Sequence, residues 1–359
     1  MYTKGNYPFK IMFSWTRRGI ITFFFTALIP VILFDIFNWK WLTLPWLPIG
    51  LVGTALAFIT GFKNNAAYDR AWEARQIYGA IVNSSRKFVM MLNDYITPEY
   101  ANDNVKEDEL FAVRQKMVHY HVAWLTCLRY NLRQSRPWEV AQTTKEDILW
   151  RKTYKIYEFV QSLEENLKPH LAHEDFEYVW TKTNKATACL KLQSNYLKEL
   201  KSKGYVEHFR HIEMANIIGE LIDSQGRAER IKNFPYPRQF ATLNNLILLI
   251  FIILLPFGIM SEFHQIGRSI ELNSAHSNLV LFIQNHFVWL TIPFSMAVSW
   301  IFYTIERTGD VTENPFVGVA NDVPITTISR AIEIEMLELI GEDVKNIPEP
   351  IPTFFDIQM

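Results

Sequence analysis

The feature that most constrains this chain is a long run without proline, residues 49–97, whose character changes part-way along. Residues 49–62 are apolar and uncharged, whereas residues 63–75 are densely polar but still rich in helix formers. As one helix, the run would measure about 70 Å at 1.5 Å per residue, more than twice a hydrocarbon core of about 30 Å. The sequence therefore predicts a helix that starts in a membrane and continues into water.

One face of this helix changes from apolar to polar along its length. At 100° per residue, Thr54, Phe58 and Phe62 fall on a single stripe. Two aromatic rings one turn apart are typical of a narrow, dry constriction, and packing between helices is the alternative role for them. The stripe continues as polar side chains that would line a wet vestibule: Asn65, Asp69 and Gln76. The pattern indicates a pore.

Four stretches are long and apolar enough to span or nearly span a membrane. They are residues 19–37, 46–62, 240–261 and 279–305, and the last two contain no Asp, Glu, Lys or Arg. No small-x-small cleavage site follows the first stretch, so we expect a retained helix and not a signal peptide. The fold class predicted is all-α: a polytopic membrane protein whose four transmembrane helices continue into a helical cytosolic bundle.

Basic residues set the expected orientation. The N-terminal segment and the long middle region are rich in Lys and Arg, whereas the two short connections carry only Lys40 and Arg268. The positive-inside rule then places both termini and the middle region in the cytosol, with the protein in the cell membrane. The predicted organisation is residues 1–62 with spans one and two, 63–239 as a cytosolic helical region, 240–305 with spans three and four, and 306–359 as a cytosolic C-terminal segment.

The middle region has the periodicity of amphipathic helices. Apolar residues recur at helical spacing in residues 110–128, 150–163 and 186–200. The acidic run that begins at Glu107 is typical of a helix N-terminus. Cys127 and Cys189 are the only cysteines, so we expect reduced thiols and no disulfide framework.

Several classes of function are disfavoured by the sequence. A net charge of −1 gives no electrostatic reason to expect nucleic-acid binding. No phosphate loop, GxSxG, HExxH or Cys-x-x-Cys motif occurs, so we expect neither an enzyme nor a cofactor. His119 and His121 point about 200° apart on a helix and cannot share a metal. His208 and His211 have better spacing but no third ligand nearby, so no metal site is predicted.

Residues 61–75, with the sequence GFKNNAAYDRAWEAR, resemble the bestrophin family, in particular its bacterial branch. Two further stretches carry the resemblance: residues 229–237, which lead into the third span, and residues 313–324, which contain Asn314-Pro315-Phe316 and Asn321-Asp322. With the four spans and the long helical insert, the resemblance extends over almost the whole chain.

The resemblance implies a homopentameric ion channel in which the second transmembrane helix of each subunit lines one central pore. It would conduct monovalent ions, with chloride and other anions favoured and cations as an alternative. The family's apolar neck corresponds to Thr54, Phe58 and Phe62, and Thr54 departs from the usual apolar residue. The family's cytosolic aperture corresponds to Phe209, with Ile212 as the alternative.

Two further expectations follow from the resemblance and the residues together. Between Asn314 and Asp322 there is none of the acidic run by which vertebrate members bind Ca²⁺, so we expect no activation by micromolar Ca²⁺. The alternative function is a membrane-embedded scaffold or enzyme with a ligand-binding helical bundle. Its focus would be the polar residues that follow the second span, Arg70, Glu73 and Arg75.

Overall fold

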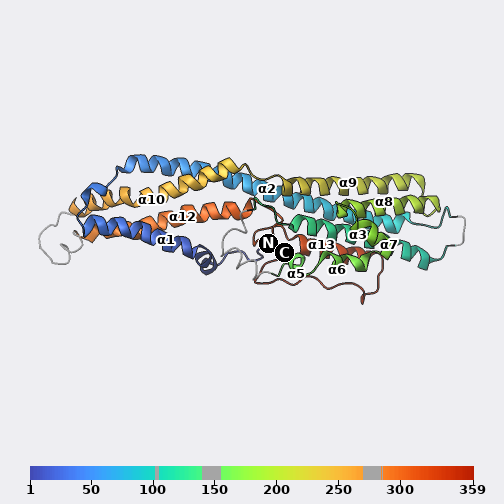
Figure 1. The fold of residues 1–359 in the computed structure, drawn as a ribbon. Helices are drawn as coiled ribbons and strands as arrows, with labels where there is room; N and C mark the ends of the chain where they lie inside the picture. The colour runs from blue at the N-terminus through green and yellow to red at the C-terminus, as the bar shows by residue number, and fades with distance from the viewer. Residues whose placement is uncertain (102–104, 140–154, 270–283, 285) are drawn as a thin grey trace. The chain divides into compact units, whose positions relative to one another are not determined.

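The computed structural model describes residues 1–101, 105–139, 155–269, 284 and 286–359. Its helices form two compact units (Figure 1). The transmembrane unit comprises Gly5–Tyr68 and Tyr236–Glu313. The extramembrane unit comprises Met1–Lys4, Asp69–Pro235 and Asn314–Met359. The predicted all-α fold is confirmed.

The transmembrane unit consists of long apolar helices. Within the described residues, four helices have the length and composition to cross a membrane, as the sequence predicts. They are α1 (Phe9–Asp35), the first part of α2 (Trp46–Tyr95), α10 (Arg238–Ser269) and α12 (Thr291–Thr312), with the short helices η1 (Lys40–Leu42) and η4 (Phe287–Leu290) before α2 and α12. The start of the predicted fourth span, residues 279–283 and 285, lies outside the described residues.

Close contacts between small and aromatic residues hold this unit together. Gly19 of α1 lies against the ring of Tyr303, and Gly53 of α2 lies against the ring of Phe251. Phe23 and Tyr303 pack edge to face with ring centroids 5.4 Å apart. Helices in lipid associate by this kind of packing, because lipid tails are as apolar as the side chains themselves.

The long proline-free segment is one continuous helix, α2, of 50 residues. The sequence predicts its helical character, and the structure extends the helix three residues before the proline-free run, to Trp46. The helix passes from the transmembrane unit into the extramembrane unit between Tyr68 and Asp69. The helix thus contributes residues to both units.

The extramembrane unit is a helical bundle (Figure 1). Its helices enclose a buried aliphatic and aromatic core. Trp124 belongs to this core and is fully buried, and its indole N–H donates to Gln225 Oε1 at 2.9 Å. Besides the second part of α2, its helices are α3 (Glu107–Arg133), α5 (Tyr157–Val160), α6 (Leu163–Leu167), η3 (Lys168–His170), α7 (His173–Trp180), α8 (Lys185–Ser202), α9 (His208–Asn233) and α13 (Ile325–Leu339).

The predicted helices at residues 110–128 and 186–200 are confirmed as α3 and α8. The helix predicted over 150–163 is wrong where the structure describes it. The chain is extended at Gln161 and Ser162, and Ser162 starts a new helix through a capping box with Glu165. This reciprocal pair satisfies two backbone N–H groups at once and fixes a boundary there. Residues 150–154 lie outside the described residues.

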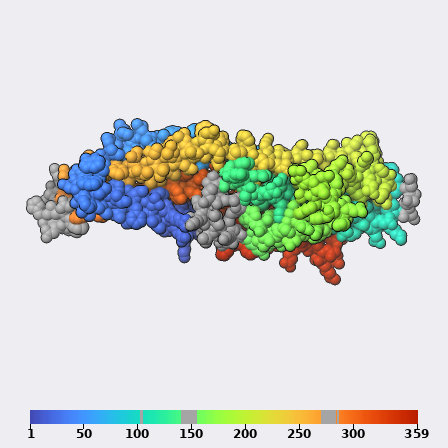
Figure 2. Space-filling model, viewed as in Figure 1, coloured from blue at the N-terminus to red at the C-terminus, as the bar shows by residue number. Residues whose placement is uncertain are grey.

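The two ends of the described chain meet in the extramembrane unit. Tyr2 and Ile357 form an antiparallel bridge, and Thr3 N–H donates to the Asp356 carbonyl at 2.9 Å. The Thr327 N–H and hydroxyl both donate to the backbone carbonyl of Met359, which attaches the C-terminal segment to α13. In the space-filling view, red C-terminal residues lie beside the green helices of this unit (Figure 2).

Candidate functional site

The predicted neck residues lie on a face of α2 that the chain leaves uncovered within the transmembrane unit. The side chains of Phe58 and Phe62 are 66% and 71% exposed, and Thr54 is exposed as well. The opposite face packs into the unit through buried Leu56 and Gly53. Large apolar rings on the open face are available to a neighbouring copy, to lipid or to a pore.

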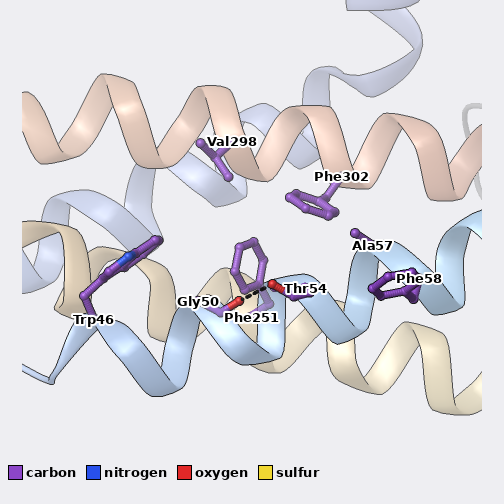
Figure 3. A pocket seen from close by; sticks show the side chains of 9 residues that line it. Trp46, Gly50, Thr54, Ala57, Phe58, Phe251, Val298 and Phe302 are labelled. Atoms are coloured by element: carbon purple, nitrogen blue, oxygen red, sulfur yellow. Dashed lines mark hydrogen bonds between the residues drawn. The ribbon is translucent and has the colours of Figure 1, made fainter.

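A groove of about 530 Å³ runs beside this face (Figure 3). Phe251 of α10 stands between α2 and α12, and Phe302 of α12 lines the opposite side. On α2 the groove is lined by small residues. Phe58 lies at one end of the groove and Trp46 at the other. The Thr54 hydroxyl donates to the Gly50 carbonyl at 3.0 Å, so its hydrogen is used within the helix.

Directly after Phe62, the buried face of α2 carries a cation. The Lys63 ammonium donates to both Glu306 and Asp310 of α12, and all three side chains are buried. Burying ions costs several kcal/mol each, and close pairing offsets that cost only when the geometry is good. The cluster therefore fixes α2 against α12 at one position.

Polar contacts extend this cluster to α10. Asn244 donates to Glu306 through its amide and accepts the Thr60 hydroxyl at 2.9 Å. One turn on from Thr60, the Asn64 amide donates to the Ile305 carbonyl at 3.2 Å. These bonds use the face of α2 opposite to Phe58 and Phe62, so they set which way the two rings point.

This cluster is not among the site residues predicted from the sequence. Lys63 follows the uncharged second span directly, and Glu306 and Asp310 follow the fourth span at helical spacing, i and i+4. All three lie just outside the apolar stretches, where charged residues are ordinarily solvated. The available signal was that two carboxylates one turn apart share a helix face.

The predicted vestibule residues are all exposed on α2. Asn65 belongs to the transmembrane unit, and Asp69 and Gln76 belong to the extramembrane unit. Asp69 has no salt-bridge partner within the part of the chain that the structure describes. An intrachain pair for Asp69, the alternative to a free carboxylate, is therefore not observed among these residues.

The two candidate aperture residues lie in the first turns of α9. Phe209 is 73% exposed and Ile212 is 41% exposed. Glu207 caps this helix by accepting the N–H groups of Phe209 and Arg210. Both residues remain candidates, because each presents an apolar side chain to the surface.

The polar residues after the second span connect helices of the extramembrane unit. Arg230 of α9 pairs with Glu73 at 2.5 Å, and Arg70 donates to the Ile231 carbonyl at 3.1 Å. Both contacts tie α2 to α9. They give Arg70 and Glu73 a structural role, and Arg75 is exposed on the same helix.

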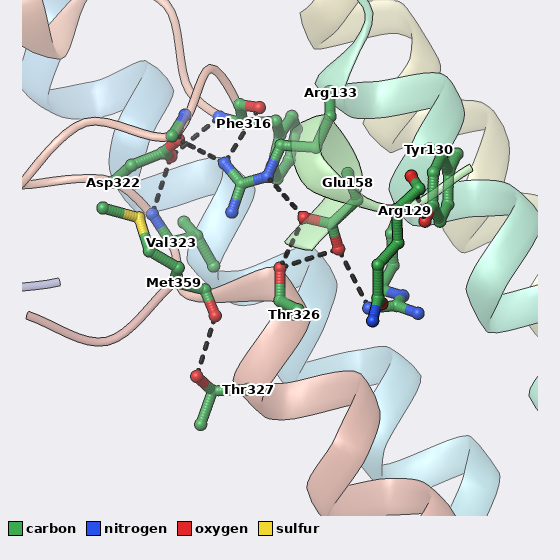
Figure 4. Close-up of polar contacts among 12 residues, drawn as sticks. Arg129, Tyr130, Arg133, Glu158, Phe316, Asp322, Val323, Thr326, Thr327 and Met359 are labelled. Atoms are coloured by element: carbon green, nitrogen blue, oxygen red, sulfur yellow. Dashed lines mark hydrogen bonds and ion pairs between the residues drawn. The ribbon is translucent and has the colours of Figure 1, made fainter. Parts of the chain in front are cut away.

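The loop after Asn314-Pro315-Phe316 is built around one carboxylate (Figure 4). Asp322 accepts the backbone N–H groups of Phe316, Gly318 and Val323, each at 2.7 Å. Arg133 donates to Asp322 at 3.1 Å and, through the same nitrogen, to the Phe316 carbonyl at 3.1 Å. A guanidinium thus supplies the positive charge for this buried carboxylate.

The same arginine belongs to a larger buried network in α3, α5 and α13 (Figure 4). Arg129 donates to Glu158 at 2.9 Å, and the Thr326 hydroxyl donates to the same carboxylate at 2.8 Å. The Arg133 Nε lies 3.7 Å from Glu158. Phe316, fully buried, is held at a φ of 73°, a left-handed conformation that is strained for a bulky residue and needs support from its surroundings.

Comparison with known proteins identifies the family. Residues 10–271 and 278–338 match the profile of the family described as Bacterial/Fungal Bestrophin protein. The chain belongs to this family. The resemblance drawn from residues 61–75, 229–237 and 313–324 is confirmed.

Two curated relatives have similar sequences over most of their length. The voltage-dependent anion channel-forming protein YneE of Escherichia coli K12 is 24% identical over 304 residues, which cover 85% of this chain and 79% of that protein. The voltage-dependent anion channel-forming protein RSc3414 of Ralstonia nicotianae is 24% identical over 295 residues, covering 82% of this chain and 77% of that protein.

The fold is also that of a solved relative. A bacterial bestrophin homologue from Klebsiella pneumoniae superposes with a TM-score of 0.70 at 21% identity. The match covers 90% of this chain and 98% of that one. Membership in this family places the protein among membrane proteins, and it indicates a channel and not an enzyme.

We predict that micromolar Ca²⁺ does not activate the protein. A Ca²⁺ site needs six to eight oxygen ligands, whereas the Asp322 carboxylate already accepts three N–H groups and Arg133. Currents from purified protein in lipid bilayers should be the same in EGTA and in micromolar Ca²⁺. A reversible increase in current with Ca²⁺ would contradict this account of the loop.

We predict that Lys63→Met strongly destabilises the transmembrane unit. The change leaves Glu306 and Asp310 buried without their cation, which should lower the free energy of unfolding by roughly 3–5 kcal/mol. The matched control is Lys87→Met on the same helix. Lys87 pairs with Glu220 at 3.7 Å in an exposed position, so this change should alter the free energy of unfolding by less than about 1 kcal/mol. Thermal unfolding of detergent-solubilised protein measures both, and equal shifts would refute the role of the cluster.

Proposed function

We propose that the protein is a homopentameric channel for monovalent ions, with anions favoured, whose central pore is lined by α2. The main support for the proposal is the uncovered aromatic pair Phe58 and Phe62. These rings lie one turn apart on the face of α2 opposite to its buried polar contacts with α10 and α12. The names of the relatives, which are voltage-dependent anion channel-forming proteins, support the choice of ion class.

Small residues beside the aromatic pair support assembly with further copies of the chain. Gly50, Ala57 and Gly61 leave the backbone of α2 accessible, and an added Cβ at Gly61 would meet nothing within 4 Å. Small residues let transmembrane helices approach closely, which is the main source of their association in lipid. The neighbouring copy would fill the groove beside Thr54.

The proposed neck acts as a hydrophobic gate. The rings of Phe58 and Phe62 offer no carbonyl or hydroxyl to replace the hydration shell of an ion. A narrow apolar constriction expels water and raises the barrier to ions. Thr54 would form the outer ring, and Phe209 or Ile212 would form a second constriction in the extramembrane unit.

The proposed location is the cell membrane, with both termini in the cytosol. The distribution of Lys and Arg supports this orientation. The antiparallel bridge between Tyr2 and Ile357 supports a common side for the two ends. The scaffold or enzyme with a site at Arg70, Glu73 and Arg75 has no comparable support, because Arg70 and Glu73 bind α9 instead.

We predict that Phe58→Ala combined with Phe62→Ala increases the open probability or the conductance. The smaller side chains would widen the constriction and lower the free-energy barrier to wetting, while the pentamer remains assembled. Single-channel recording measures the open probability and the conductance. Native mass measurement of the purified oligomer shows whether the pentamer remains assembled.

The matched control replaces two exposed phenylalanines outside α2, Phe25 of α1 and Phe294 of α12. This control should leave gating unchanged. If Phe58 and Phe62 were instead buried packing residues in the assembly, each truncation would cost about 3–5 kcal/mol and pentamer yield would fall first. An intact pentamer with wild-type gating and conductance would show that the rings are not the gate.

We predict that Asp69→Asn raises the chloride-to-sodium permeability ratio. Five symmetric copies of Asp69 would form a ring of carboxylates, which attracts cations and disfavours anions. Reversal potentials in salt gradients measure the ratio, with Asp108→Asn, an exposed carboxylate at the start of α3, as the control. An unchanged ratio in Asp69→Asn would exclude the ring.

A further inference from the structure

Two histidines far apart in the sequence face each other in the extramembrane unit. His119 of α3 and His170 of η3 have their Nδ1 atoms 3.2 Å apart, with ring centroids at 5.4 Å and an angle of 37° between the rings. Both side chains are partly buried, and the His170 side chain is 16% exposed. His119 and His121 cannot share a metal on one helix, and the structure supplies a different partner for His119, namely His170.

The separation of the two nitrogens fits a shared metal ion. Zinc binds imidazole nitrogen at about 2.0–2.1 Å in tetrahedral geometry, which places two such nitrogens about 3.3 Å apart. The observed 3.2 Å is close to that value. Metal binds the neutral form of an imidazole.

The far side of His170 faces a carboxylate. Its Nε2 lies 3.9 Å from the Glu333 carboxylate of α13, which also pairs with Arg330 at 3.3 Å. Histidines that bind metal through one nitrogen almost always donate the other N–H to a carboxylate, carbonyl or water. When both Nδ1 atoms bind a metal, the His170 proton is on Nε2 and faces Glu333.

Water would complete the coordination. Within the described part of the chain, no group of three His, Cys, Asp or Glu side chains has the geometry to hold a metal. Glu342 is near enough to act electrostatically on His119, but Gln115 and Asn346 donate to its carboxylate at 2.6 and 2.7 Å.

We propose that His119 and His170 bind one zinc-like divalent transition-metal ion per subunit, and that Glu333 orients His170 for this. The ion would join α3 to η3, and through Glu333 to α13. Free energy of binding to the folded state adds to stability. The metal would therefore stabilise the bundle independently of whether the pore conducts.

The test is zinc binding to the purified, assembled protein, without a histidine tag and after removal of metals with EDTA. Isothermal titration calorimetry should give one ion per subunit for the wild type, and zinc should raise the midpoint of thermal unfolding. His119→Asn and His170→Asn should each abolish this binding. Glu333→Gln should weaken it about tenfold, the effect of removing the carboxylate behind a metal-binding histidine.

The matched control is His208→Asn combined with His211→Asn, the pair on α9 with the best ligand spacing in the sequence. It should bind zinc as the wild type does. X-ray absorption of the wild type at the zinc edge should show two imidazole nitrogens, and it tests the site even if a variant fails to fold. Loss of binding in the α9 control, binding unchanged in both His119→Asn and His170→Asn, or no imidazole in the absorption spectrum would overturn the proposal.

Discussion

The burial of Lys63 between Glu306 and Asp310 is the interaction on which the arrangement of the transmembrane unit depends. An ammonium away from water is tolerated only with its counter-charges in contact, so α2 cannot rotate or slide against α12 without losing several kcal/mol. Thr60 and Asn64 add hydrogen bonds on the same side of the helix. Because Phe62 precedes Lys63 directly, a constraint on one face of α2 also determines where the opposite, aromatic face points.

Most of the fold could be predicted from the sequence, because it depends on features that are local along the chain. Apolar length identifies the membrane helices, and the absence of proline in residues 49–97 predicts the continuity of α2. Periodicity likewise identifies α3 and α8. The prediction failed between Tyr157 and Leu163, where apolar spacing continues but Ser162 and Glu165 form a capping box. There, satisfying backbone N–H groups outweighs the apolar pattern.

The candidate site could be predicted only in part. Thr54, Phe58 and Phe62 share a face because of helical geometry alone, and that face is exposed as the neck hypothesis requires, although its place in a pore remains a prediction. The contacts that position this face join residues about 240 apart in the chain, such as Lys63 and Glu306. Spacing within one segment contains no information about such pairs. The same holds for Arg133 with Asp322 and for His119 with His170, each of which depends on how separate helices pack.

In the proposed channel, the free energy of exposing an apolar ring to its solvent accounts for both the exposed rings and the gate. In lipid, an exposed Phe58 or Phe62 costs little, because lipid tails are as apolar as the ring, so exposure alone does not drive assembly. Close packing at Gly50, Ala57 and Gly61 must therefore supply the association. Once assembly places the rings around an aqueous pore, each ring that water contacts costs free energy in proportion to its apolar area. Five copies of each ring multiply that cost around one narrow section, so the dry state is favoured until a change in the pore widens it.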